Sequence, residues 1–318
     1  MAPNPVARTI SVVVPVYNSA SSLNMLVDRL QTVLGPIVPA FEIVLVNDAS
    51  RDDSWQVIDE RSKLDARVRG IDLARNQGQH NALLCGMRAA RYEIIVTLDD
   101  DLQQLPEEIP KLLEKLEDGY DVVYGARRDE RHGLLRGIAA RITKLTLQRA
   151  MGAETAASLS PFRAVRTSVR DAFADYRGPY VNIDVLLTWG TSRFGGVPVT
   201  HAARSRGVSN YTLRLLARHA FNMITGFSTM PLKIASLMGF AFTAFGMFVL
   251  GFVLVRYALV GGVTPGFPFL ASIVAILSGA QLFALGMIGE YLARMHLRLM
   301  DRPAYVIRSA TAPERTVE

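Results

Sequence analysis

The sequence predicts an α/β protein in which a mostly parallel central sheet is followed by a two-helix transmembrane hairpin. Between residue 10 and about residue 126, short β-branched runs alternate with longer amphipathic stretches, which is typical of strand and helix units around a parallel sheet. Near the C-terminus, residues 234–255 and 267–289 carry no charge. Each is long enough to cross a bilayer as a helix, which takes about 20 residues.

The expected elements alternate strand and helix along the chain. Strands are expected at 10–14, 41–46, 68–73, 93–98 and 122–124, and helices at 22–34, 52–63, 79–90 and 106–117. The strands are short runs rich in Val, Ile and Leu. Asp52 and Asp53 suit the positive end of the second helix, and Pro106 before two glutamates is typical of a helix start. In open sheets of this kind, ligands bind beyond the carboxyl ends of the strands.

The hydropathy divides the chain into four parts. We expect a cytoplasmic domain at 1–210, an amphipathic interfacial helix at 211–230, the transmembrane hairpin at 231–292 and a cytoplasmic tail at 293–318. The connector at 257–268 is uncharged, with only Arg256 at its edge, whereas basic residues precede the first span and follow the second. These are Arg214, Arg218, Lys233, Arg294, Arg298, Arg302 and Arg308. The positive-inside rule therefore predicts a multi-pass protein of the inner (plasma) membrane with both termini in the cytoplasm.

The net charge of +6 arises partly from the basic residues that flank the two predicted spans. Many of the cations lie where a membrane protein faces anionic lipid, so we expect a membrane partner and no nucleic acid. The single cysteine, Cys85, excludes an internal disulfide and a cysteine-based metal cluster. Glycines in the first span leave a homo-oligomer open.

Polar residues recur where the predicted strands end. Residues 15–18, 47–50, 75–80 and 99–103 follow the first four strands, at the edge where a ligand is expected. The acidic run is the sharpest of these segments, because Asp99, Asp101 and Gln103 point the same way if the chain is extended. Such a pair of carboxylates favours Mg²⁺ or Mn²⁺ with a nucleotide diphosphate. The alternative is a solvated loop and helix start.

Several longer motifs occur together. They are VVVPVYN, VNDASRDDS, LARNQGQHNALLCGM, TLDDDLQQLPEEIPKL and RSRGVSNYTLRL. In combination they resemble the inverting family 2 glycosyltransferases of GT-A fold, which is a Rossmann-like nucleotide-sugar domain. Within that family the resemblance is to the polyprenyl-phosphate glycosyltransferases, which include dolichyl-phosphate mannose synthase, bactoprenyl glucosyltransferases and undecaprenyl-phosphate aminoarabinose transferases.

The resemblance implies a role for specific residues. Those that would bind the nucleotide sugar are Pro15, Tyr17, Asn18, Asp48, Arg75, Asn76, Asp100, Arg206 and Ser209. Asp99, Asp101 and Gln103 would hold the metal. The catalytic set would be Asp99, Asp101, Arg127 and Asp184. The implied donor is a UDP-sugar by preference, with a GDP-sugar as the alternative.

The acceptor implied by the resemblance is a polyprenyl phosphate. Its phosphate would be bound by Arg127, Arg136 and Arg141, since a guanidinium fork suits phosphate oxygens. Alternatively, some of these arginines only line a surface helix. A phosphate with a second pKa near 6 is already anionic at pH 7, so no strong general base is needed.

Two departures from the family pattern leave alternatives open. Residues 156–159 lack the acidic residue that family members commonly carry there, and Asn210 stands where lysine is common. Asp184 is another acidic candidate, although it also suits a helix start. We expect transfer of one sugar to an undecaprenyl-type phosphate at the cytoplasmic leaflet. The alternatives are a non-catalytic membrane partner of the same fold and a polysaccharide-synthase-like transferase.

Overall fold

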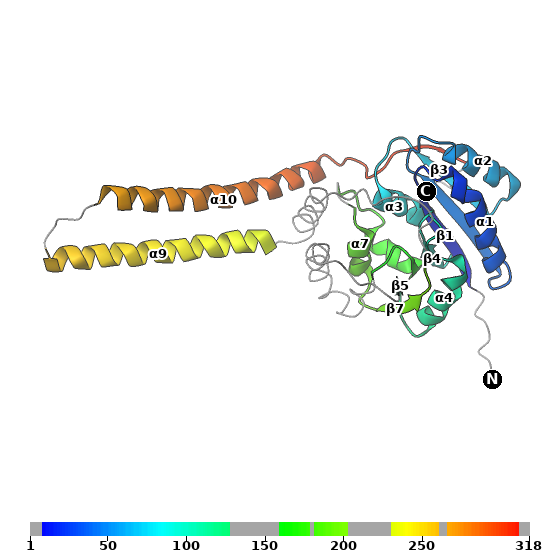
Figure 1. The fold of residues 1–318 in the computed structure, drawn as a ribbon, viewed down its shortest axis with the longest axis horizontal. Helices are drawn as coiled ribbons and strands as arrows, with labels where there is room; N and C mark the ends of the chain where they lie inside the picture. The colour runs from blue at the N-terminus through cyan, green and yellow to red at the C-terminus, as the bar shows by residue number, and fades with distance from the viewer. Residues whose placement is uncertain (1–7, 128–158, 179–180, 203–229, 261–265, 312–318) are drawn as a thin grey trace. The chain divides into compact units, whose positions relative to one another are not determined.

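The computed structural model describes residues 8–127, 159–178, 181–202, 230–260 and 266–311 (Figure 1). The chain divides into two compact units, one of Met1–Thr212 with Arg302–Glu318 and one of Leu213–Asp301. Residues of the C-terminal tail therefore belong to the first unit. The predicted interfacial helix at 211–230 lies almost entirely outside the described residues, and so do Arg136, Arg141, Arg206 and Ser209.

The first unit contains a mixed α/β sheet. Its strands are β1 (Thr9–Val16), β2 (Ala40–Asn47), β3 (Val68–Leu73), β4 (Ile94–Thr97), β5 (Val122–Arg127), β6 (Arg163–Arg166), β7 (Phe194–Val199) and β8 (Ile307–Ala310). Its helices are α1 (Ala20–Leu34), α2 (Ser54–Leu64), α3 (Gln79–Ala89), α4 (Ile109–Glu117) and α7 (Ile183–Gly190), with 3-10 turns η1 (Pro106–Glu108) and η2 (Thr167–Phe173). Every strand and helix predicted from the sequence in this unit is present, with ends shifted by a few residues.

The strand order is β7-β5-β6-β4-β1-β2-β3-β8 among the described residues. The central pairs β4–β1, β1–β2 and β2–β3 are parallel, as predicted. The strands that the sequence analysis did not predict are β6, β7 and β8. Of these, β6 is antiparallel to β4 and β5, and β8 is antiparallel to β3.

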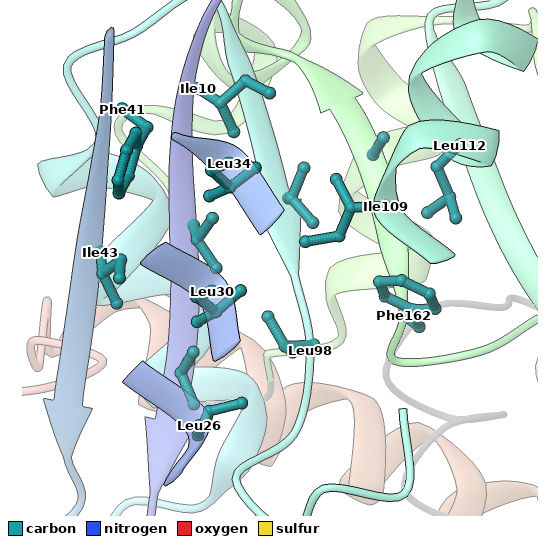
Figure 2. Close-up of a cluster of buried hydrophobic side chains, with 14 of the residues drawn as sticks. Ile10, Leu26, Leu30, Leu34, Phe41, Ile43, Leu98, Ile109, Leu112 and Phe162 are labelled. Carbon is teal, nitrogen blue, oxygen red and sulfur yellow. The ribbon is translucent and has the colours of Figure 1, made fainter. Parts of the chain in front are cut away.

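Helices pack on both faces of the sheet. On one face, α1 buries Leu26, Leu30 and Leu34 against β1 and β2, and α4 extends this apolar cluster (Figure 2). On the other face, α3 packs closely enough that a Cβ on Gly86 would lie 2.3 Å from a methyl carbon of Val13. The parallel strands are thus buried on both faces, which explains why β1, β2 and β4 are predominantly apolar along their length.

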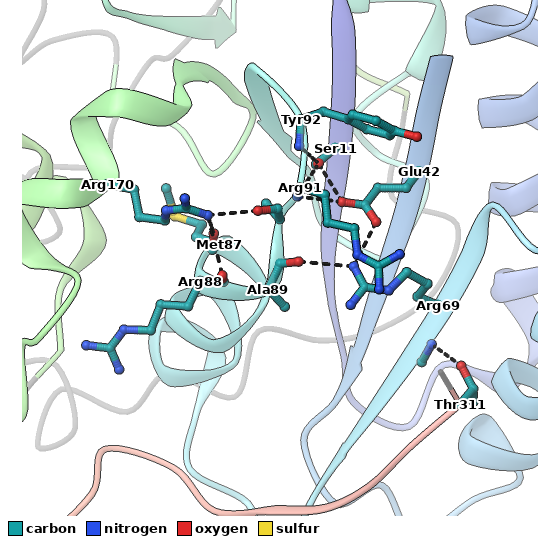
Figure 3. A network of polar contacts seen from close by, with 12 residues as sticks. Ser11, Glu42, Arg69, Met87, Arg88, Ala89, Arg91, Tyr92, Arg170 and Thr311 are labelled. Atoms are coloured by element: carbon teal, nitrogen blue, oxygen red, sulfur yellow. Dashed lines mark hydrogen bonds and ion pairs between the residues drawn. The ribbon is translucent and has the colours of Figure 1, made fainter. Parts of the chain in front are cut away.

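A buried charge network lies near the beginning of the central strands, away from their carboxyl ends (Figure 3). Arg69 of β3 forms an ion pair with Glu42 of β2 at 2.7 Å, and both side chains are buried. Ser11 of β1 donates its hydroxyl to the same carboxylate at 2.7 Å. A buried pair of this kind needs such additional hydrogen bonds to offset its desolvation. The network therefore belongs to the fold rather than to a ligand site.

The second unit contains helices α9 (Met230–Val260) and α10 (Phe267–Leu299), which contact each other. Their most apolar stretches are Leu232–Arg256, with a mean hydropathy of 2.2, and Ile276–Leu299, with a mean hydropathy of 1.3. Large apolar side chains such as Phe240 and Phe248 are exposed. Both helices are long and apolar enough to cross a bilayer, which indicates a membrane-associated protein.

Candidate functional site at the carboxyl edge of the sheet

Asp48 lies where β2 ends and is almost fully buried, with an exposed fraction of 3%. Its two carboxylate oxygens accept backbone N–H groups of Gln77 at 2.7 Å and Gly78 at 2.8 Å. Gly78 has a φ of +90°, a conformation that side chains disfavour, and directly precedes α3. Burial raises the pKa of Asp48, and the two backbone hydrogen bonds oppose that rise. Asp48 thereby joins the end of β2 to the loop that follows β3.

The loop after β1 contacts both neighbouring segments. The backbone N–H of Tyr17 donates to Asp100 Oδ2 at 3.0 Å, and that of Asn18 donates to Ser50 Oγ at 3.0 Å. Tyr17 is 45% exposed, so its ring is available to a ligand. Pro15 precedes this loop as a buried residue of β1. The predicted donor residues Tyr17, Asn18 and Asp100 are therefore brought together.

The acidic run forms a turn after β4 rather than an extended segment. Asp100 and Asp101 lie in the turn, and Leu102 has a φ of 59°. The turn brings Asp101 and Gln103 into contact, because the Gln103 side-chain amide donates to one Asp101 oxygen and its backbone N–H to the other at 3.1 Å. Asp99 accepts hydrogen bonds from two other glutamines, Gln79 and Gln104.

Two glutamines hold Asp99. Gln79 at the start of α3 donates to Asp99 Oδ1 at 2.6 Å, and Gln104 donates to Oδ2 at 3.1 Å. Burial raises the pKa of Asp99 to about 7, and the charges of Asp101 and Asp100 add to that rise. Burial also raises the pKa of Asp100. Three neighbouring carboxylates thus create a site where a bound cation would relieve electrostatic repulsion.

The donor atoms of this turn suit a hard divalent cation. In the described residues, no three His, Cys, Asp or Glu side chains converge into a ready-made metal cage. Mg²⁺ does not require one, because it usually takes one or two carboxylates and completes its shell with water and phosphate oxygens. Both carboxylates accept hydrogen bonds from glutamines, Asp101 from Gln103 and Asp99 from Gln79 and Gln104. They differ in exposure, because Asp101 is exposed whereas Asp99 is only partly exposed. The turn favours Asp101 and Gln103 as direct ligands.

Asp184 belongs to a largely buried polar cluster with Arg163 and Tyr124. It forms an ion pair with Arg163 and accepts the Tyr124 hydroxyl at 3.0 Å. Arg163 is 1% exposed and also donates to Thr97 at 3.1 Å. Asp184 is therefore a paired carboxylate in the first turn of α7, not an isolated base.

Other predicted residues are placed only in part. Asn76 donates its side-chain amide to the Asp48 carbonyl at 3.3 Å, and Arg75 beside it is exposed. Arg127 is the last residue of β5, and its backbone pairs with Val199 of β7. The segment leading toward Arg206 reaches the acidic turn, because the Ala202 N–H donates to the Gln103 carbonyl at 2.9 Å.

Sequence reasoning missed three residues that shape this site: Gln79, Gln104 and Arg163. Gln79 belongs to the polar segment 75–80, which the sequence predicts to lie at the carboxyl edge of the sheet, so its position could have identified it as a site residue. Gln104 directly follows the acidic motif. Arg163 gave no such signal, since a charged residue in a strand is ordinarily expected to be exposed.

Comparisons with known proteins agree on one family. Residues 11–172 match the profile of glycosyl transferase family 2. The undecaprenyl-phosphate 4-deoxy-4-formamido-L-arabinose transferase of Shewanella sediminis is 35% identical over 311 residues, covering 96% of this chain and 94% of that protein. The protein of the same name from Yersinia pestis is 33% identical over 320 residues, covering 99% of this chain and 98% of its own.

Solved structures show the same fold at lower sequence identity. Glucosyl-3-phosphoglycerate synthase from Mycobacterium tuberculosis, in complex with Mn²⁺, UDP and glucosyl-3-phosphoglycerate, aligns with a TM-score of 0.51 at 20% identity. The alignment covers 69% of this chain and 79% of the synthase. At this identity the likeness is one of fold.

Proposed function

Because this chain belongs to glycosyltransferase family 2 and has the GT-A fold, we propose that it transfers one sugar from a nucleotide diphosphate sugar to a polyprenyl phosphate of undecaprenyl type. One observation carries the proposal. The acidic turn is bonded both to the loop after β1, through Tyr17, and to the start of α3, through Gln79. The loop that we propose binds the nucleotide and the turn that we propose binds the metal are thus joined by hydrogen bonds, in a chain that also has two long apolar helices.

The proposed donor site is built around Asp48. The nucleoside would lie against Pro15, Tyr17, Asn18, Arg75 and Asn76, with Asp100 holding the first loop in place through the Tyr17 N–H. Both oxygens of Asp48 are engaged by the loop after β3, so a base would use their remaining lone pairs. Arg206 and Ser209 remain proposed diphosphate contacts. We favour a UDP-sugar over a GDP-sugar on the resemblance to bacterial enzymes.

We propose Mg²⁺ or Mn²⁺ as the cofactor, held by Asp101 and Gln103 with Asp99 close by. Bound there, the cation would neutralise the nucleotide diphosphate as it leaves. Asp99 and Gln79 would orient the turn through their hydrogen bond. The occurrence of Mn²⁺ with UDP in a structure of the same fold supports this choice.

The acceptor phosphate would be the nucleophile of a single inverting displacement. Its oxygen is anionic at pH 7, so the reaction needs no strong base from the protein. The pairing of Asp184 with Arg163 and Tyr124 fits this account, because it leaves Asp184 a positioning residue rather than a base. Arg127, with Arg136 and Arg141, would bind the acceptor phosphate. The relatives' printed acceptor, undecaprenyl phosphate, supports the lipid assignment.

We further propose that α9 and α10 cross the inner membrane as a hairpin, with the GT-A domain and both termini in the cytoplasm. The charge pattern that flanks the two helices supports this orientation. The domain limits 1–210, 211–230, 231–292 and 293–318 remain part of the proposal, except that the tail from residue 302 belongs to the first unit and adds β8 (Ile307–Ala310) to its sheet. A homo-oligomer is compatible with the same arrangement.

The test compares two acceptors with the purified full-length protein in detergent. Nucleotide sugars, including one that carries 4-deoxy-4-formamido-L-arabinose, are supplied with Mn²⁺ and either undecaprenyl phosphate or undecaprenol. The proposal expects donor consumption only with the phosphorylated lipid. Equal consumption with undecaprenol, or hydrolysis of the donor to free sugar at the same rate with either lipid, would contradict it.

A further inference from the structure

The chain returns to the nucleotide-binding sheet after its last apolar helix. β8 pairs antiparallel with β3, with Ala310 opposite Ile71 and Ile307 opposite Leu73. Thr311 extends this pairing, because Gly70 donates its N–H to Thr311 Oγ1 at 2.8 Å (Figure 3). The tail thus covers a strand edge that would otherwise expose unpaired backbone groups.

The tail also holds the first residue of the loop that follows β3. The Ala74 N–H donates to the Val306 carbonyl at 2.8 Å. The Ala74 carbonyl accepts Arg308 Nη2 at 2.7 Å. Both backbone polar groups of Ala74 are therefore bonded to the tail. The next four residues, 75–78, form the loop whose N–H groups grip Asp48.

Arg308 makes a second contact, to Asp72, which connects it to the residue preceding Asp48. Its Nη1 lies 3.3 Å from Asp72 Oδ2, and Asp72 is only 3% exposed. The other oxygen of Asp72 accepts the side-chain amide of Asn47 at 2.7 Å. Asn47 directly precedes Asp48. Arg308 is thus bonded to the residue that opens the loop and, through Asp72, to the strand end that carries Asp48.

The sequence pattern grouped Arg308 with the cations that face lipid. In the structure its guanidinium instead bridges a buried carboxylate and a loop carbonyl, although its side chain remains 59% exposed. An exposed arginine that only balanced membrane charge would need neither contact. The bridge joins the tail to the end of β3 and, through Asp72, to Asn47 at the end of β2, next to the candidate donor site.

We propose that Arg308 is a positioning residue for the donor nucleotide, which makes the segment after the last membrane helix part of the nucleotide-binding machinery. The inference rests on the proposed function for the identity of the ligand. Holding Ala74 fixes the entry to loop 75–78, so less backbone entropy is lost when the nucleotide binds. Loss of the bridge is expected to weaken nucleotide binding without altering the chemical step.

The experiment uses the full-length protein in detergent with Arg308→Ala, Arg308→Lys and a matched control, Arg67→Ala. Arg67 is also a half-exposed arginine paired with a carboxylate, Asp65, but it lies just before β3, at the opposite end of that strand from Ala74. Binding of UDP and of GDP, each with Mn²⁺, is measured by calorimetry. Hydrogen exchange of the Ala74, Gln77 and Gly78 amides is measured without nucleotide, and donor KM and kcat are measured in the transfer assay.

Wild type is expected to bind one of the two nucleotides more tightly. Arg308→Ala is expected to raise the Kd for that nucleotide about fivefold, the effect of losing one or two exposed hydrogen bonds. Donor KM should rise by a similar factor with kcat unchanged. Exchange at Gln77 and Gly78 should accelerate, Arg308→Lys should recover part of each effect, and Arg67→Ala should stay within about twofold of wild type.

The outcomes separate this inference from the proposed function. Unchanged exchange at Gln77 and Gly78 in Arg308→Ala, or an unchanged nucleotide affinity, would overturn the positioning role. The positioning role would also be overturned if Arg308→Ala left donor KM unchanged and lowered kcat and the thermal midpoint only as much as Arg67→Ala does. If exchange accelerates in Arg308→Ala but wild type binds neither UDP nor GDP, the contact between the tail and the loop is supported and the proposed donor class is wrong.

Discussion

Gln79 donates its side-chain amide to Asp99 Oδ1 at 2.6 Å, which joins the first residue of α3 to the first residue of the acidic run. The two residues are 20 positions apart in sequence and come from neighbouring strand-to-helix connections. This bond fixes the acidic turn relative to the loop that holds Asp48. The orientation of the acidic turn, which we propose binds the metal, is therefore set by a residue outside the acidic motif.

Replacing Gln79 with alanine is expected to lower kcat/KM about tenfold, the effect of losing a hydrogen bond to a carboxylate at a partly exposed position. Gln79→Glu should cost more, because it places a like charge beside Asp99. Gln56→Ala, which removes an exposed glutamine paired with Glu60 on α2, is the matched control. Steady-state kinetics on the three variants check this order, and equal activity in all three would contradict it.

Asp101→Asn and Gln103→Ala are expected to raise the Mn²⁺ concentration for half-maximal activity by about tenfold or more, because each removes a proposed oxygen ligand. The control is Asp118→Asn, an exposed carboxylate bonded to Lys115 at the end of α4. Titration of turnover with Mn²⁺ measures the effect. If both site variants keep the wild-type Mn²⁺ dependence, the ligand assignment is wrong.

Arg163→Met is expected to destabilise the protein by about 3–5 kcal/mol, because it leaves Asp184 without its cation next to a buried tyrosine. Arg193→Ala breaks an ion pair whose arginine side chain is 67% exposed, so it should cost no more than about 1 kcal/mol. Denaturant unfolding of the full-length protein in detergent, followed by tryptophan fluorescence, compares the two. Equal losses would show that the Arg163 pair is not effectively buried.

Asp121 is expected to contribute to acid sensitivity. Burial alone would raise the pKa of Asp121, but hydrogen bonds from Arg193 and Thr191 outweigh it and hold the pKa below its ordinary value. A carboxyl with a depressed folded pKa contributes stability that is present above its unfolded pKa, near 3.9. That contribution is lost as the pH falls through the folded pKa.

The thermal midpoint of wild type should therefore fall more steeply between about pH 5 and pH 3 than that of Asp121→Asn, because this range spans the unfolded pKa of an aspartate, about 3.9. Melting curves at several pH values measure the two slopes. Parallel slopes for wild type and Asp121→Asn would contradict the contribution of this carboxyl.

The parallel half of the fold was predictable because its signals are local. β1, β2 and β4 are predominantly apolar runs bounded by turn residues, and the helices that follow the strands carry recognisable starts such as Pro106. β6 and β8 are four-residue strands whose antiparallel pairing depends on partners far away in sequence. No local pattern distinguishes them from loops, so the sequence analysis left them out.

The candidate site was predictable to a similar degree. Asp48 and residues 99–103 follow predicted strands directly, so the sequence alone predicts that they lie at one edge of the sheet. The different hydrogen-bond partners of Asp99 and Asp101 were not predictable. They depend on the left-handed backbone at Leu102 and on Gln79, which lies at the start of α3. Arg308 was assigned to the lipid because sequence shows its charge but not the fold of the tail back onto β3.

The central claim is tested most directly by the mass of the lipid product. Purified full-length protein is incubated with undecaprenyl phosphate, Mn²⁺ and each nucleotide sugar in turn, and lipids are read by mass spectrometry for wild type and Asp101→Asn. The account predicts one lipid product, heavier than undecaprenyl phosphate by a single sugar residue, whose formation is strongly reduced in the variant. A polymer on the lipid, an undecaprenyl diphosphate sugar, or no lipid product from any donor despite nucleotide binding would contradict it.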